Sequence, residues 1–72
     1  MGAANKEVLT GVVKFFSTQK GYGFIKDDLS ENEYFVHITG VKMKTSLKKN
    51  DLVIFQLEDA KRGVKAVNVV CR

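Results

Sequence analysis

The most informative stretch of this sequence is Lys20-Gly21-Tyr22-Gly23-Phe24-Ile25. Aromatic and β-branched residues favour extended strands, and successive side chains in a strand point to opposite faces. Tyr22 and Phe24 therefore share one face of the segment, while Gly23 and Ile25 share the other. The glycines leave the backbone bare, so we expect flat ligands to approach it closely.

A second aromatic segment, Tyr34-Phe35-Val36-His37-Ile38, repeats this pattern. Phe35 and His37 share one face, and Val36 lies on the opposite one. If the two segments pair as a hairpin, four planar rings lie side by side. A strand in a single-layer barrel has only one inward face, and Val36 and Ile25 already supply apolar residues for it. The rings are therefore expected outside, where a patch of this size usually marks a binding site.

The rest of the chain also favours strands, separated by polar segments with turn chemistry. The connection Thr39–Asn50 could hold one short helical turn, but it has no amphipathic pattern long enough for a standard helix. The expected strands are Val8–Phe16, Tyr22–Lys26, Tyr34–Ile38, Leu52–Glu58 and Val64–Val70.

The last two expected strands show clear alternation. In the fourth, the faces are Val53, Phe55 and Leu57 against Ile54, Gln56 and Glu58; in the fifth, Val67 and Val69 oppose Asn68 and Val70. Five short strands in so small a chain cannot stack as two full sheets, and closing the sheet removes its exposed edges. The predicted fold is all-β, a five-stranded antiparallel barrel of the OB-fold type.

Size and charge narrow the function classes. The chain has 72 residues, so it holds one domain at most, and 12 Lys+Arg against 8 Asp+Glu give a net charge of +4. A small basic domain suggests a polyanionic partner, most often a nucleic acid. We expect a flexible arm at residues 1–7, a domain at residues 8–72 and, without a membrane span or export signal, a cytoplasmic location.

Three segments carry a family resemblance. Lys14-Phe15-Phe16, the stretch from Lys20 to Ile25, and Phe35-Val36-His37 resemble, in order and spacing, the signature segments of the bacterial cold shock proteins. The resemblance covers about residues 9–70. It implies an OB-fold that binds single-stranded RNA or DNA, often as an RNA chaperone or regulator in a stress response.

The resemblance also implies the site. The residues that would stack on bases are Phe15, Tyr22, Phe24, Phe35 and His37. The basic residues that would contact the nucleic-acid backbone or base edges are Lys14, Lys20 and Arg62. The aliphatic residue Ile38 stands where the family usually has another ring.

The chain departs from the family pattern at several points. Phe15 stands where the family usually has Trp, and Ile38 offers apolar contact but no π face. The connection before Ser46 is shorter than usual and lacks the ring often found there, with Met43 and Lys44 nearby instead. The usual Pro after the basic-Gly pair is Val64. These changes predict weaker or shorter-range binding, at about 1–3 kcal/mol for each lost stack.

Lysines in the long connection and around the last hairpin could form a track for phosphates, although each one singly is typical of a solvated surface. They are Lys42, Lys44, Lys48 and Lys49, then Lys61, Arg62 and Lys65. The acidic segment 27–33 should lie off this track or limit its extent.

Other classes of function have less support. The same patch could serve a small-barrel protein-interaction module, which is the alternative from a different class. An enzyme has no catalytic constellation behind it, because His37 has no nucleophile or carboxylate pair beside it in the motif. One cysteine, Cys71, allows neither an intrachain disulfide nor a Cys/His metal set. We expect no cofactor, no metal, no membrane contact and a monomer.

Overall fold

The secondary structure follows the predicted succession of strands. A computed structural model of the chain describes residues 7–42, 47–61 and 63–72. Each expected strand is present, with its ends within two residues of the prediction, and the short helical turn forms directly after the third strand. The elements are β1 (Leu9–Ser17), β2 (Tyr22–Asp27), β3 (Glu33–His37), the 3₁₀ helix η1 (Ile38–Gly40), β4 (Leu52–Ala60) and β5 (Gly63–Cys71).

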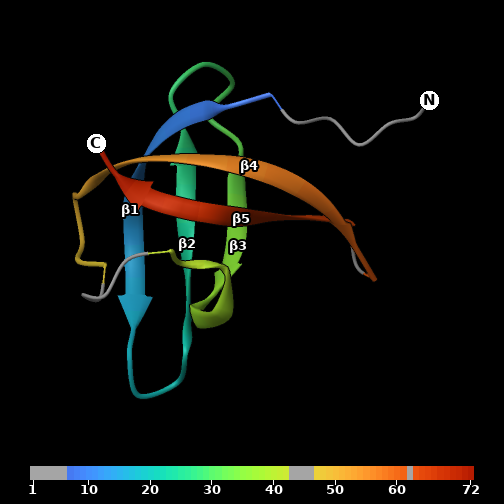
Figure 1. Ribbon diagram of the computed structural model, residues 1–72. Helices are drawn as coiled ribbons and strands as arrows, with labels where there is room; N and C mark the ends of the chain where they lie inside the picture. The colour runs from blue at the N-terminus through green and yellow to red at the C-terminus, as the bar shows by residue number, and fades with distance from the viewer. Residues whose placement is uncertain (1–6, 43–46, 62) are drawn as a thin grey trace.

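The strands close into a barrel in the order β1-β2-β3-β5-β4. In Figure 1, β1, β2 and β3 stand side by side, and the long strands β4 and β5 curve across them. The predicted five-stranded barrel is therefore confirmed. In the described residues no helix is long and apolar enough to cross a membrane.

One strand pair departs from the antiparallel prediction. Four of the neighbouring pairs are antiparallel, but β3 and β5 run parallel, with Phe35 opposite Lys65 and Val36 opposite Ala66. Direction can alternate all the way around a closed ring only when the number of strands is even. A closed barrel of five strands must therefore contain one parallel contact, and here it brings β5 beside the aromatic strand β3.

The core is formed by the inward face of each strand and one residue of the connection before β4. Ile25 and Val36 are fully buried, as predicted, and Phe55 is the largest buried side chain. Leu57, predicted to share the face of Phe55, is half-buried and packs against the core. The buried apolar cluster is Val13, Ile25, Val36, Leu47, Val53, Phe55, Ala66 and Val69.

The predicted alternation of β5 is wrong in one respect. Ala66 and Val69 enter the core, three residues apart, while Val67 is only half-buried. Asn68 adopts a left-handed conformation with φ of 54°, and the register with β4 shifts nearby. This β-bulge inserts one extra residue and resets which side chains face inward. Asn is one of the few residues that tolerate this conformation.

The two glycines around Tyr22 have structural tasks. Gly21 has φ of +80° in the turn between β1 and β2, and its N–H donates to the Ser17 carbonyl oxygen at 2.7 Å. Gly23 is buried, and a Cβ there would clash with the backbone and ring of Phe16. The expectation that Gly23 opens the backbone to a flat ligand is therefore wrong, because its bare face packs on β1.

Removing one buried methyl group should destabilise the barrel measurably. We expect Ile25→Val to lower the free energy of unfolding by about 1 kcal/mol, because Ile25 has no solvent exposure. The matched control is Ile38→Val, the same chemical change at a side chain that is 42% exposed, with an expected cost under about 0.5 kcal/mol. Urea unfolding of both variants measures the difference; equal costs would contradict the assigned core.

Candidate nucleic-acid interface

The outer face of β1, β2 and β3 carries a continuous cluster of rings. Strand register brings the rings together, since Phe24 lies opposite both Phe15 and Phe35, and Tyr22 lies opposite His37. These five residues, Phe15, Tyr22, Phe24, Phe35 and His37, are called the aromatic platform below.

The rings of the platform contact one another. The centroids of Tyr22 and Phe35 are 5.7 Å apart and the two rings are nearly parallel, at 23°. Phe24 meets Phe35 edge to face at 6.0 Å, and Phe15 meets Tyr22 edge to face at 5.9 Å. Such contacts are favourable beyond area burial. The rings therefore hold one another in place before any ligand arrives.

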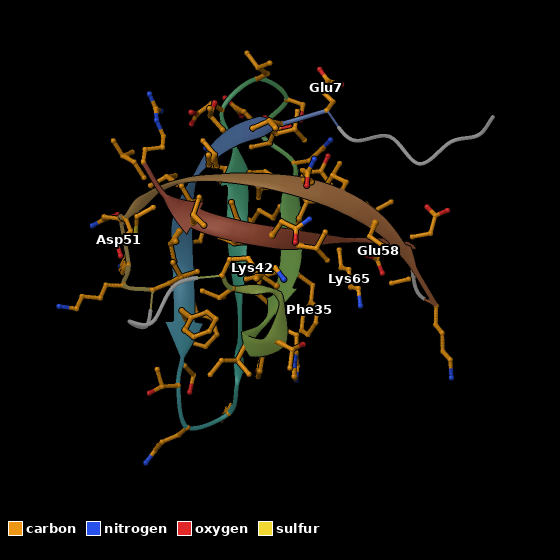
Figure 2. The ribbon with its side chains drawn as sticks, viewed as in Figure 1. Glu7, Phe35, Lys42, Asp51, Glu58 and Lys65 are labelled. Atoms are coloured by element: carbon orange, nitrogen blue, oxygen red, sulfur yellow. The ribbon has the colours of Figure 1, made fainter. Side chains whose placement is uncertain are left out.

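The platform remains open to solvent. Phe15 is 44% exposed and Phe35 is 37% exposed. His37 is exposed as well, while Tyr22 and Phe24 are half-buried by their ring neighbours. Figure 2 shows the side chain of Phe35 projecting beyond the edge of the ribbon. The prediction that the rings lie outside the barrel is confirmed.

A β-bulge in β1 places the first ring. Strict alternation from the buried Val13 would turn Phe15 inward. The register with β2 shifts between these two residues, so Lys14 and Phe15 are both exposed. Phe16 then turns inward and packs against the core. The bulge thus adds a cation and a ring to the outer face at one point.

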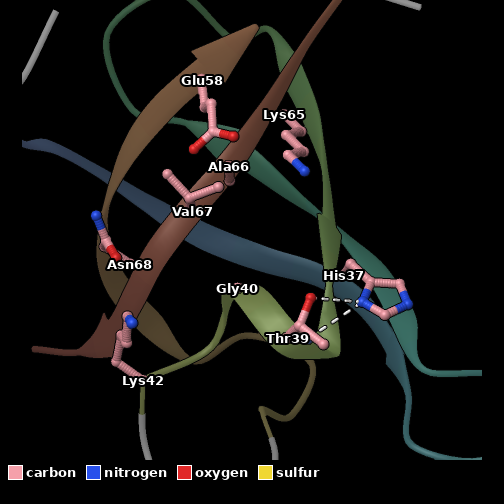
Figure 3. A pocket seen from close by; sticks show the side chains of 9 residues that line it. All are labelled: His37, Thr39, Gly40, Lys42, Glu58, Lys65, Ala66, Val67 and Asn68. Carbon is pink, nitrogen blue, oxygen red and sulfur yellow. Dashed lines mark hydrogen bonds between the residues drawn. The ribbon is translucent and has the colours of Figure 1, made fainter. Parts of the chain in front are cut away.

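His37 is held by Thr39 at the start of η1. The Thr39 backbone N–H donates to His37 Nδ1 at 3.2 Å, and Thr39 Oγ1 lies 2.9 Å from the same nitrogen. Figure 3 draws both contacts. An acceptor nitrogen carries no proton, so the proton of the neutral ring sits on Nε2. His37 therefore offers a ligand a flat face and one N–H donor.

Ile38 lies at the edge of the platform. Its backbone N–H donates to the Gly21 carbonyl oxygen at 2.9 Å, which ties η1 to the turn before β2. The side chain of Ile38 is exposed and lies beside Gly21. It extends the ring surface with an aliphatic contact.

The described part of the structure includes two of the three predicted basic site residues. Lys14 and Lys20 are exposed, at the bulge of β1 and in the turn before β2. Arg62 lies outside the described residues, as do Met43, Lys44 and Ser46. The sequence placed Lys65 only among the cations of a possible phosphate track, whereas the parallel pairing sets it directly opposite Phe35. No alternation pattern could have found this neighbour, because it depends on how the barrel closes.

The acidic loop between β2 and β3 lies away from the platform. Tyr22 pairs with His37 at one end of the hairpin, whereas Lys26 pairs with Glu33 at the other, next to the loop. Asp27 is buried and accepts from the Leu29 backbone N–H at 2.8 Å. Its carboxylate therefore shapes the loop. Over the described ranges, no three His, Cys, Asp or Glu side chains gather as metal ligands.

Comparison with known proteins gives the family. The model of the 'Cold-shock' DNA-binding domain matches residues 9–71. The chain belongs to the cold-shock domain family. Membership in this family makes it a nucleic-acid-binding domain.

Curated relatives agree with this assignment. The chain is 48% identical over 65 residues to the cold shock-like protein CspE of Bacillus anthracis, covering 86% of this chain and 94% of the relative. It is 41% identical over 64 residues to the cold shock-like protein CspG of Escherichia coli K12, covering 86% and 91%.

A solved structure shares the fold. The structure titled drosophila Unr CSD456 superposes with a TM-score of 0.78 at 19% identity. The match covers 93% of this cold-shock domain and 27% of that longer chain. The resemblance stated from the signature segments is therefore confirmed by family, relatives and fold.

The protonation of His37 can be checked directly. At pH 8 we expect ¹⁵N NMR to show Nε2 protonated and Nδ1 bare, because Nδ1 accepts the Thr39 N–H. Thr39→Val should keep this tautomer, since it removes Oγ1 but leaves the backbone donor. A ring protonated on Nδ1 would contradict the observed cap.

Proposed function

We propose that this protein binds single-stranded RNA or DNA by stacking unpaired bases on the aromatic platform. The observation that supports this best is the geometry of the rings: they lie on one outer face, contact one another, and stay open to solvent. Every base has a π face, so the proposal predicts modest sequence preference across most of the platform.

Stacking on protein rings favours single strands. In a duplex the base faces are already occupied by neighbouring bases, whereas an unpaired strand can turn its bases toward the protein. Each stack contributes about 1–3 kcal/mol. A protein that binds the open form shifts RNA hairpins toward it by mass action, without a fuel. This is the activity of a passive RNA chaperone, and it needs no catalytic group.

The basic residues serve the phosphates in this proposal. Lys14 and Lys20 are exposed near the β1 side of the platform, and Lys65 lies across β3 from it. The chain carries a net charge of +4. The rings contact base faces and the lysines contact phosphates. RNA and DNA share both groups, so the proposal covers both nucleic acids.

The proposal needs one chain, because β1, β2 and β3 of a single barrel supply the whole platform. A monomer, a cytoplasmic location and a flexible arm at residues 1–7 stay predictions. The rival function, docking of a peptide on the same rings, is not favoured by the family of the chain. The two functions also differ in their expected response to salt, because apolar peptide docking releases no counterions.

Truncating a platform ring should weaken binding without unfolding the protein. We expect Phe35→Ala to lower affinity for a single-stranded heptanucleotide roughly 5- to 100-fold, the equivalent of one lost stack. The control is Leu29→Ala, an exposed side chain in the β2–β3 loop that should leave affinity unchanged. Fluorescence titration gives affinity and thermal unfolding gives stability; loss of the fold in Phe35→Ala would place that ring in the core.

A salt series separates nucleic-acid binding from peptide docking. Affinity for a single-stranded oligonucleotide should fall as salt rises, with a log–log slope of about −0.7 for each phosphate neutralised. The duplex of the same sequence should bind more weakly throughout. A flat salt response, or preference for the duplex, would refute stacking with phosphate contacts.

A further inference from the structure

A groove lies next to the aromatic platform, on the far side of β3. Its volume is about 220 Å³, and η1, β4 and β5 form its walls. Drug-sized ligands occupy pockets of roughly 300–1,000 Å³, so this groove suits a smaller group such as one nucleobase. Its lining includes His37, Gly40, Lys42, Glu58, Lys65 and Val67, as Figure 3 shows.

The groove adjoins the platform. His37 belongs to both, and the parallel pairing of β3 with β5 sets Lys65 beside Phe35. A nucleic-acid strand that crosses β1, β2 and β3 in turn therefore meets this groove as it leaves the rings. Lys42 at the rim is held by its backbone N–H, which donates to the Val69 carbonyl oxygen at 2.8 Å, and its ammonium adds positive charge there.

The groove differs from the platform in chemistry. The platform presents rings, which can stack on the face of any base. The groove instead presents the carboxylate of Glu58 and the ammonium of Lys65 together. Glu58 lies directly opposite Lys65 in the β4–β5 register, and both residues line the groove. In Figure 3, Glu58 lies on the β4 side of β5 and Lys65 on the β3 side. Within ranges 7–42, 47–61 and 63–72, neither forms an ion pair. Val67 supplies an apolar wall between these charges and η1.

We propose, on the basis of the proposed function, that this groove is a subsite that binds one nucleobase carrying an amino group. We expect it to prefer guanine over the other bases. A carboxylate only accepts hydrogen bonds, and an ammonium only donates them. Guanine carries two adjacent donors, N1–H and the N2 amino group, beside the acceptor O6. Glu58 would accept from the donors and Lys65 would donate to O6. Cytosine and adenine offer one amino group, and thymine and uracil offer none.

The test uses heptathymidylate with a single guanine at either the 5′ or the 3′ end. A bidentate base contact corresponds to roughly 5- to 100-fold discrimination, and for this exposed carboxylate we expect at least about fivefold. Only one of the two ends should show it, because only one end of a bound strand reaches the groove. Cytosine and adenine at that end should give smaller gains than guanine.

Two variants assign the effect to the groove. Glu58→Gln should reduce the guanine preference to less than about twofold, because the amide replaces one acceptor by a donor. Asp59→Asn is the matched control, removing the same charge at the next position of β4, outside the groove lining, and should keep the preference. Lys65→Gln should also lower the guanine preference, whereas its control, Lys49→Gln, should keep it. Both variants should reduce the salt slope, because each removes one positive charge.

The outcomes separate the two proposals. Salt-dependent binding of heptathymidylate without guanine preference at either end would overturn the subsite and leave the platform function standing. A guanine preference unchanged in Glu58→Gln would also overturn it. If the wild type binds none of these oligonucleotides, the platform function fails and the subsite fails with it.

Discussion

Each strand of a closed single-layer barrel has only one inward face, and this geometry sets where the core residues and the rings of the domain lie. The small core takes one set of side chains from each strand, including Ile25, Val36 and Phe55. The alternate set has nowhere to go except the surface. On β2 and β3 that alternate set consists largely of rings. Burial of one face thus creates the exposed platform on the other, and no separate force is needed to hold the rings outside.

Two β-bulges then adjust the alternation where function or closure requires it. In β1 the bulge turns both Lys14 and Phe15 outward and lets Phe16 pack on the core. In β5 the bulge at the left-handed Asn68 brings Ala66 and Val69 into the core, where strict alternation from Ala66 would turn Asn68 inward. Both β-bulges change which side chains point into the barrel without ending the strand. The first one completes the platform with a ring from a third strand.

The parallel contact between β3 and β5 has a functional consequence. It places Lys65 beside Phe35 and brings η1 against β5, so that the rings end at a charged groove. One surface therefore combines two kinds of recognition. The platform reads base faces, which all bases share, and the groove presents polar groups that can distinguish base edges. The hydrogen bond from Thr39 to His37 holds the residue at the junction of the two.

The strands, the barrel class and the outward facing of Tyr22, Phe24, Phe35 and His37 could all be predicted from the sequence. These features follow from local period-two patterns and from family signature segments, which need no long-range information. The bulges, the close packing of Gly23 against β1 and the pairing of Lys65 with Phe35 were not predictable from the sequence. Each of these depends on which strands become neighbours and in what register, and that is fixed by closure of the whole barrel around its core.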